Sequence, residues 1–400
     1  MSQILLRPAH QAAEGAPQQT AAPAPAPAMD CRLVRLQAEG TGASGPQDST
    51  ADLSARAPQS ARNGGAAPGS ARIAKELVHL SFDDAVHLTG CEQQDPTHFT
   101  LTGSWPAHTT HHVPGHGTHY ETLTVAQTIR QTGLFLAHTV FEAPLDHATL
   151  LNTFSYTLNP HAAAGSGGET PFRIDVTATP SAPRTPHITA LHLHMTISSV
   201  EPAAGPGAAS GEASGTVLVT GETTFEWIPP AVFRRIRGEY HKPPTTPPPL
   251  TPYLPPAQVG RTRPDEVLLS PTDRPREWHL RHPWDNKLLY DHAVDHVPGL
   301  VLIEAAGQAA YTTTAPLAGT GGPGAGSCGC APTAPGSGYR PQPVTTHTTF
   351  HRYTEFDTPV TLTIDTRTTA HTTTRTTTGH QNGRPVFTTT HTTPATPVDD

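Results

Sequence analysis

The sequence is poor in charged residues, in cysteine and in aromatic side chains. Only 14% of its 400 residues are charged, against roughly 25% in an average soluble domain. The formal net charge is −8, which argues against a general nucleic-acid-binding protein because phosphate contacts need a basic surface. The four cysteines lack the paired spacing of a zinc site or of a disulfide framework.

Long apolar runs are also absent. None reaches the roughly 18 residues that a membrane-spanning helix needs, and the start, MSQILLRPAH, lacks the apolar core of a signal peptide. We therefore expect a soluble, cytoplasmic protein that binds neither membranes nor nucleic acid.

Proline and glycine are abundant, with 44 and 34 residues. The Ala/Pro-rich residues 1–73 are expected to be a disordered tail, because they offer little apolar surface to offset the entropy of ordering. Residues 242–258 are expected to form a stiff Pro-rich linker. Residues 202–215 read as an enlarged hairpin loop, and Cys328 and Cys330 lie in a further Gly/Pro-rich loop.

The linker separates two segments that repeat one another, residues 74–241 and 259–392. The three matching stretches are VHLSFDDAVHLT (78–89) with VGRTRPDEVLLS (259–270), FTLTGSW (99–105) with WHLRHPW (278–284), and THYETLTVAQTIRQ (118–131) with DHVPGLVLIEAAGQ (295–308). Their offsets are 181, 179 and 177, so they occur in the same order with small deletions. This pattern indicates an internal duplication.

Each copy is expected to hold one helix among several antiparallel strands, which is an α+β architecture. Apolar residues recur at three- and four-residue spacing in both copies, the pattern of one buried helix face. In the first copy they are Leu123, Ala126, Ile129, Gly133, Leu134 and Ala137, and in the second Leu300, Ile303, Ala306 and Ala310. A strand start precedes each helix, and TLTIDTRTTAHT (361–372) alternates as a strand does.

The segment DHAVDHVPGLVLIEAAGQAA (291–310) resembles the active-site helix of hotdog-fold acyl-carrier-protein dehydratases. With RQTGLFLAH (130–138), SWPAHT (104–109) and FRRIRG (233–238), the chain more closely resembles the AfsA family, the A-factor (γ-butyrolactone) synthases built as tandem hotdog repeats. The resemblance implies a double hotdog, in which each repeat wraps an antiparallel β-sheet around one central helix and the two repeats pair as an internal pseudo-dimer.

The resemblance also implies a reaction. Members of the family transfer a β-ketoacyl group from acyl carrier protein to the hydroxyl of dihydroxyacetone phosphate, a step of γ-butyrolactone-type signal biosynthesis that needs no metal or other cofactor. Two alternatives stay open. One is a hotdog dehydratase or thioesterase acting on carrier-bound acyl chains, and the other is a non-catalytic acyl-binding protein.

The chain departs from the Glu-x-x-Arg-Gln pattern that the family carries on its repeat helices. The first helix has Gln127 in place of the Glu, and the second has Gly307 in place of the Arg. One carboxylate and one guanidinium therefore survive, split between the two repeats.

Four residues are candidates for catalysis. Glu304 lies on the apolar stripe of the second helix and suits a general base. His296 and His119 each lie eight residues before the equivalent helix positions and suit a proton relay. Gln308 follows Glu304 by one turn, and His292 is a rival to His296. The competing structural interpretation makes the histidines turn residues and the glutamine a packing residue.

Three residues are candidates for substrate binding. Arg130 suits a bidentate contact with the phosphate of the acceptor, and Gln131 adjoins it. The amide at Gly299 begins the second helix and suits an oxyanion. A surface ion pair is the competing interpretation for Arg130.

Histidines are frequent in the segment that precedes the first helix. The cluster comprises His108, His111, His112, His116 and His119. A chain with 25 histidines forms such clusters by chance, so we predict no metal site.

Overall fold

The structure is a computed structural model that describes residues 72–107, 110–113, 117–120, 122–159, 162, 168–181, 190–200, 215–313 and 345–394. The predicted tail lies outside these residues, apart from Arg72 and Ile73, whose backbone or side chain bonds to residues 86–88. The loop with Cys328 and Cys330 also lies outside them.

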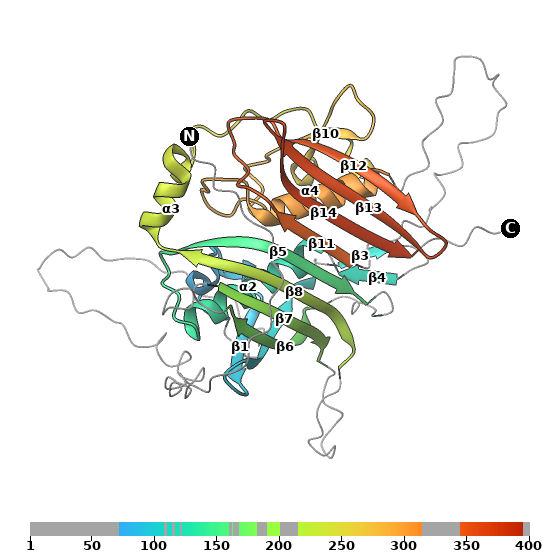
Figure 1. Ribbon diagram of the computed structural model, residues 1–400. Helices are drawn as coiled ribbons and strands as arrows, with labels where there is room; N and C mark the ends of the chain where they lie inside the picture. The colour runs from blue at the N-terminus through green and yellow to red at the C-terminus, as the bar shows by residue number, and fades with distance from the viewer. Residues whose placement is uncertain are drawn as a thin grey trace, which may run out of the picture.

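One 12-stranded antiparallel sheet contains strands of both repeats (Figure 1). The first half of the sheet has the order β1 (Leu88–Gln93), β2 (His98–Trp105), β6 (Thr170–Pro180), β7 (Ala190–Ser199), β8 (Val217–Ile228) and β5 (Ala148–Leu158). The second half continues with β11 (Thr345–Phe350), β14 (Arg384–Pro394), β13 (Thr372–Gln381), β12 (Thr361–Thr368), β10 (Glu277–Leu280) and β9 (Leu269–Pro271). Read outward from the seam between β5 and β11, the two halves place corresponding strands in the same order.

The seam is an antiparallel ladder that runs from the pair Thr345 and Thr157 to the pair Thr349 and Thr153. It joins the repeats through main-chain hydrogen bonds, which do not involve the Pro-rich linker. From here on, the first half means the elements up to β8, and the second half means those from Pro256 onward.

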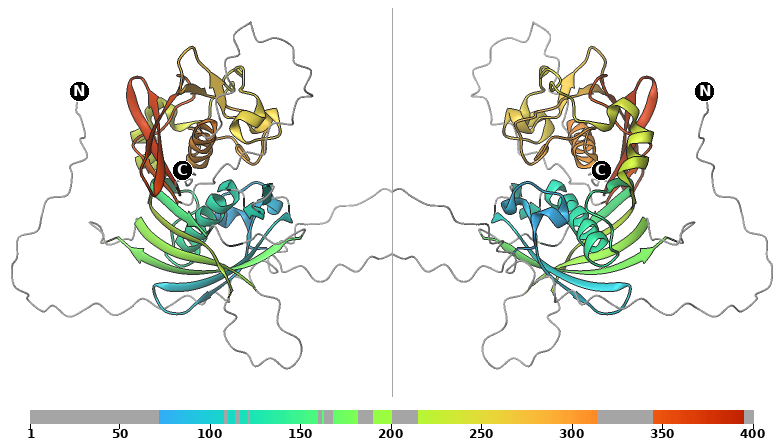
Figure 2. Two further views of the ribbon diagram at one scale, coloured as in Figure 1. Left: turned by 90° about the vertical axis from the view of Figure 1, so that its right-hand side faces the viewer. Right: turned by 90° about the vertical axis from the view of Figure 1, so that its left-hand side faces the viewer.

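Two long helices, one in each half, confirm the predicted helical stripes. α2 (Thr122–Thr139) lies against the inner face of the first half-sheet and α4 (Gly299–Thr312) against that of the second, as Figure 2 shows. Their apolar faces are buried, including Ile129 in α2 and Ile303 and Ala306 in α4. The helices also contact each other, so each half contributes side chains to the other. Leu123 packs on the second core, and Ile303 belongs to the first.

The repeated segments 78–89 and 259–270 do not begin as strands. Each starts with a 3₁₀ turn, η2 (Lys75–Val78) or η6 (Pro256–Val259), that ends in a residue with positive φ, His79 at 52° and Gly260 at 70°. A second turn follows, η3 (Asp83–Ala85) or η7 (Pro264–Glu266), and only then β1 or β9. The two copies therefore share a turn pattern that hydropathy alone does not reveal.

Two other expectations need adjustment. The stretch 361–372 is two strands, because Thr369 N donates to Thr372 O at 2.8 Å and turns β12 into β13. The His-rich segment before α2 contains a short hairpin, β3 (Thr110–Val113) and β4 (Gly117–Tyr120). In contrast, β7 and β8 pair antiparallel on either side of residues 202–215, which confirms the hairpin connection.

After β8 the chain forms α3 (Pro230–Arg237) and η5 (Gly238–His241) and then the Pro-rich segment. That segment has no helix or strand up to Pro255. Its end is attached to the second half, because Leu254 N donates to Leu269 O at 3.1 Å and Arg281 Nε donates to Thr251 O at 3.2 Å. The C-terminal part of the linker therefore packs on the second half.

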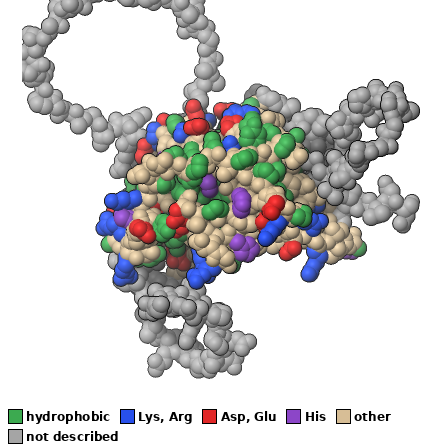
Figure 3. All heavy atoms as spheres, turned by 90° about the horizontal axis from the view of Figure 1, so that it is seen from above, with side chains coloured by type: hydrophobic (Ala, Val, Ile, Leu, Met, Phe, Trp, Pro, Cys, Tyr) green, Lys and Arg blue, Asp and Glu red, His purple; other side chains and the backbone are tan. Residues whose placement is uncertain are grey.

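The surface is mixed in character. The large apolar side chains most exposed to solvent include Leu288 at 71% and Leu250 at 56%. Figure 3 shows apolar side chains spread between charged and histidine side chains on the face seen from above. Among the helices that the structure describes, none is long and apolar enough to cross a membrane.

Candidate active site

Glu304 lies in the middle of α4 with only 4% of its surface exposed. Its Oε1 accepts hydrogen bonds from Arg261 Nε at 3.0 Å, from Arg261 Nη2, and from Gln308 Nε2 at 2.7 Å. Within the part of the chain that the structure describes, Oε2 accepts none. One carboxylate oxygen is therefore fixed by three donors while the other is available to a substrate, an arrangement suited to proton abstraction.

Arg261 is the residue that sequence analysis missed. It follows the η6 turn, and its Nη1 also donates to Gly260 O at 3.0 Å. In the repeat alignment it stands opposite Leu80. The two aligned stretches differ at most other positions as well, including Phe82 opposite Arg263, so the sequence alone does not single out Arg261.

Each half has an arginine side chain beside its first 3₁₀ turn, but the two arginines come from different elements. In the first half Arg130 of α2 donates to Val78 O at 3.2 Å, beside the η2 turn. In the second half the position equivalent to Arg130 is Gly307, where an added Cβ would have no neighbour within 4 Å. Arg261 supplies the guanidinium of the second half instead.

Arg130 lies at the junction of the two halves. Burial lowers the pKa of its guanidinium, and the carboxylate of Asp291 in the second half acts in the opposite direction. Asp291 also accepts a hydrogen bond from Ser81 N at 2.9 Å. Among the described residues no contact joins Arg130 to Glu304, so the two are not a single ion pair as placed here.

The two candidate glutamines make the same contacts in the two halves. Gln131 donates to Ala85 O and accepts from His87 N, both at 2.8 Å. Gln308 donates to Glu266 O and accepts from Leu268 N, again both at 2.8 Å. Each amide therefore holds its helix to the segment that enters the first strand. Gln308 additionally donates to Glu304, so it also orients the carboxylate.

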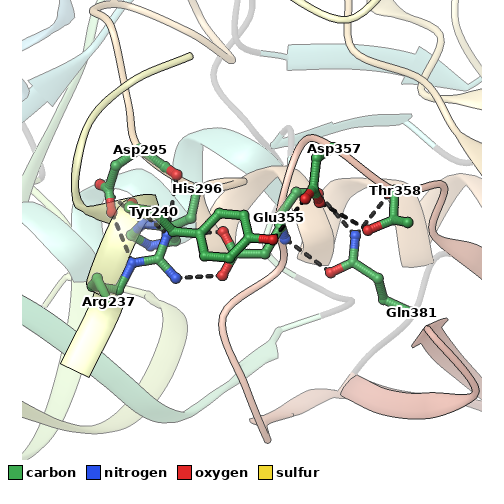
Figure 4. A network of polar contacts seen from close by, with 8 residues as sticks. All are labelled: Arg237, Tyr240, Asp295, His296, Glu355, Asp357, Thr358 and Gln381. Atoms are coloured by element: carbon green, nitrogen blue, oxygen red, sulfur yellow. Dashed lines mark hydrogen bonds and ion pairs between the residues drawn. The ribbon is translucent and has the colours of Figure 1, made fainter.

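His296 lies shortly before α4, in a partly buried polar network (Figure 4). Its Nδ1 is 3.1 Å from Asp295 Oδ1, and its ring meets the Tyr353 ring edge-on at 4.9 Å. Burial raises the pKa of Asp295, but His296 and Arg237 outweigh that effect and hold this pKa below its usual value. The carboxylate is therefore charged and lies beside the imidazole, although His296 Nδ1 makes no hydrogen bond with any residue that the structure describes.

Arg237, the last residue of α3, is the centre of that network. Its side chain donates to Asp295 Oδ2 at 3.1 Å and to both oxygens of Glu355, and it stacks on Tyr353 with the guanidinium carbon 4.1 Å from the ring centroid. Figure 4 shows Arg237 between the two carboxylates. The segment FRRIRG thus reaches across from the first repeat to position the loop before α4.

Tyr156 of β5 brings the first half to Glu304. Burial raises the pKa of its phenol to about 12, and the charge of Glu304 acts in the same direction. The neighbouring hydroxyls of Thr346 and Thr122 act on this pKa in the opposite direction. Tyr156 is therefore a protonated hydrogen-bond donor near the carboxylate, contributed by the opposite repeat.

Gly299 begins α4 at a close approach to the seam. A Cβ there would lie 3.1 Å from Phe350 Cζ and 3.3 Å from Leu151 Cδ2. The absence of a side chain lets the start of α4 approach β5 and β11, next to the strands that carry Tyr156 and Thr346.

The remaining histidine candidates are less well defined. His119 lies in β4, and its side chain lies outside the described part of the structure, as do those of the other cluster members. His292 pairs with Asp291 through Nδ1. Within the residues placed by the structure, no group of three His, Cys, Asp or Glu side chains is arranged to hold a metal.

Comparison with known proteins gives a consistent result. The family model described as AfsA, the A-factor biosynthesis hotdog domain, matches residues 63–213 and 244–326. A 2-oxo-3-(phosphooxy)propyl 3-oxoalkanoate synthase of Streptomyces virginiae is 33% identical over 238 residues, which cover 60% of this chain and 76% of that protein. A protein of the same name from Streptomyces coelicolor is 30% identical over 299 residues, covering 74% and 83%. A third, from Streptomyces griseus, is 28% identical over 334 residues, covering 78% and 95%.

Proposed function

Because this chain belongs to the AfsA family of A-factor biosynthesis hotdog proteins, we propose that it makes a phosphorylated 3-oxoacyl ester. The acyl donor is a β-ketoacyl thioester on acyl carrier protein, and the acceptor is dihydroxyacetone phosphate. The product belongs to γ-butyrolactone-type signal biosynthesis. The names of the relatives support the substrate class, since they specify a 3-oxoalkanoate and a phosphooxypropyl group.

The observation that carries the proposal is the buried carboxylate of Glu304. The acceptor hydroxyl attacks the thioester carbon, a C–O bond forms and the C–S bond breaks. Oε2 of Glu304 takes the hydroxyl proton while Arg261 and Gln308 hold Oε1. The leaving thiolate takes up a proton, for which His296, beside the carboxylate of Asp295, is the candidate donor.

The site combines elements of both repeats. Tyr156 comes from the first, Glu304 from the second, and Arg237 links α3 to the loop that holds His296. We propose that the two repeats act as an internal pseudo-dimer with one working site. The phenol of Tyr156 and the amide at Gly299 are the candidate donors for the thioester oxyanion.

Turnover of defined substrates tests the function directly. Purified protein is incubated with β-ketoacyl carrier protein and dihydroxyacetone phosphate, and the phosphorylated ester is measured by mass spectrometry. We expect ester from the unaltered protein and a loss of about 10²–10⁴ in rate with Glu304→Gln, the usual effect of removing a positioned base. Glu222→Gln, on the exposed face of β8, is the matched control and should keep the full rate.

Other outcomes identify the alternatives. Release of free acid without the acceptor would indicate a thioesterase, and loss of water from a β-hydroxyacyl carrier a dehydratase. Binding of the acyl carrier without any turnover would indicate an acyl-binding protein. Arg130→Ala tests the predicted phosphate contact, with the Michaelis constant for the acceptor rising more than kcat falls.

A further inference from the structure

One row of cross-strand partners crosses the sheet at the seam, and its character changes there. In the second half the row is polar and in the first half it becomes apolar beyond Tyr156. From β13 to β7 its members are Arg375, His391, Thr346, Tyr156, Gly221 and Met195. All are buried, with Arg375 at 9% and the other side chains at 2% or less.

Packing explains the sizes of these side chains but not their polarity. In the first half of the molecule, Ile129 lies over the row, since a Cβ on Gly221 would be 2.9 Å from Ile129 Cδ1. The repeat counterpart of Ile129 is Ala306, so the second helix leaves more room above the sheet. Leucine or methionine would fill that room at no electrostatic cost, whereas His391 and Arg375 do so as polar groups.

No carboxylate among the described residues matches the charge of Arg375. Its Nε donates to Thr313 Oγ1 at 3.0 Å and its Nη1 to Thr393 Oγ1 at 3.2 Å, and within the described ranges it makes no ion pair. Arg237, by comparison, holds two carboxylates. The C-terminal end of α4, at Thr313, supplies roughly half a negative charge. This partial charge does not replace a carboxylate partner.

A second unmatched group lies beside it. Thr377 is two residues further along β13, hence on the same face as Arg375, and it is fully buried. Its hydroxyl has no hydrogen-bond partner among the residues that are placed. Burial and the neighbouring Arg375 lower the pKa of His391 to about 4, so the imidazole is neutral and adds no balancing charge. Buried groups of this kind call for an anion or water as partner.

We propose that Arg375, together with the hydroxyl of Thr377, binds the phosphate group of a substrate. A guanidinium matches two phosphate oxygens, and the Thr377 hydroxyl donates to a third. The hydroxyls of Thr313 and Thr393 hold the guanidinium in place, because they accept from Arg375 and donate to the carbonyls of Ala310 and Thr373. This inference rests on the proposed function, in which both substrates carry phosphate. The group is either the monoester of the acceptor or the phosphodiester of the carrier's pantetheine arm.

The test uses the melting temperature of the full chain with Arg375→Met, which keeps the aliphatic length and removes the charge. The probes are inorganic phosphate, dihydroxyacetone phosphate and pantetheine 4′-phosphate, each against sodium chloride at equal ionic strength. For the unaltered protein we expect Tm to rise by about 2–4 °C at tenfold saturation. The variant should lose that rise while melting no lower than the parent in chloride, because it removes an unpaired buried charge.

Arg281→Met is the matched control. Arg281 is equally buried, at 6%, but donates to the backbone carbonyls of Thr251, Pro264 and Val267. Its variant should melt lower and keep the phosphate response. Whichever of the two organic phosphates raises Tm more, in a manner that depends on Arg375, is the source of the group. Ester formation by Arg375→Met should show an increase of about 10–100-fold in the Michaelis constant for that substrate alone.

The outcomes separate the two proposals. If phosphate stabilises Arg375→Met as well as the parent, or stabilises neither, the phosphate site is wrong even where ester is formed. If Arg130→Ala rather than Arg375→Met loses the response, the site lies at Arg130. If the response depends on Arg375 but no ester is ever formed, the phosphate site stands and the synthase function fails.

Discussion

The two helices are held to the sheet in the same way but carry different charges. Gln131 and Gln308 make matching bonds with residues 181 positions apart, Ala85 with Glu266 and His87 with Leu268. The duplicated framework is thus preserved in detail. The guanidinium, in contrast, belongs to the helix in the first half and to the turn in the second. The comparison teaches that the repeats share their support and have diverged in their chemistry.

The largest effect is expected from Arg261→Leu. This substitution gives the turn of the second half the residue type found at the equivalent position of the first half, Leu80. It leaves Glu304 buried beside only one remaining donor, Gln308. Removing one partner of a buried ion pair costs about 3–5 kcal/mol, so Tm should fall by many degrees and ester formation by about 10²-fold or more. Arg261→Lys should lose less of both. A fully active Arg261→Leu would show that the ion pair plays no part in the reaction.

Acid should destabilise the protein, and chiefly its second half. Burial lowers the pKa of His79, His282 and His391 to about 4, from about 6.5 in an unfolded chain. The unfolded state then binds more protons between these values, so the free energy of unfolding is constant above pH 6.5 and falls from there to pH 4. Each imidazole contributes up to about 1.4 kcal/mol per pH unit.

Urea unfolding at a series of pH values measures that slope. His391→Gln should make it shallower by one imidazole, whereas His194→Gln, on the exposed face of β7, should leave it unchanged. An unaltered slope in His391→Gln would mean that His391 binds its proton at the same pH in the folded and the unfolded protein.

Loss of the shared glutamine contact should destabilise both halves. Gln131→Leu and Gln308→Leu each leave a buried backbone N–H and C=O unpaired, which costs about 1–3 kcal/mol. Both should lower the free energy of unfolding in urea titrations, Gln308→Leu by more because it also removes a donor from the buried carboxylate of Glu304. Only Gln308→Leu should also slow ester formation, because only Gln308 contacts the carboxylate. Equal activities would remove Gln308 from the site.

The smallest effect is expected from Gly307→Arg. Nothing lies within 4 Å of the added Cβ, so Tm and ester formation should stay close to the parent values. In the Arg261→Leu background the same substitution supplies a guanidinium from the helix, as in the first half, and should restore part of the activity. Absence of any rescue would show that the origin of the guanidinium matters as well as its presence.

Much of the framework followed from the sequence because its causes are local or repeated. The helix stripes at Ile129 and Ile303 depend on spacing, and the duplication follows from three ordered matches. Arg261 was missed because its link to Glu304 spans 43 residues and passes through turns that no hydropathy pattern indicates. The polar row was missed because neighbours such as Arg375 and His391 become visible only when the strand register is known. Threonines on β13 and β14, including Thr377 and Thr389, are fully buried, which their polarity does not indicate.

The seam between β5 and β11 has a consequence for how the molecule can vary. A symmetric homodimer has the same sequence on both sides of its interface, so every substitution alters two sites at once. Here residues 153–157 of the first half pair with residues 345–349 of the second, which are a different sequence. The core of one half can therefore change while the core of the other is conserved. Because both lie on one chain, their pairing is governed by the effective concentration of a tethered partner. Dilution should therefore leave the two halves paired, and with them the proposed site to which both halves contribute.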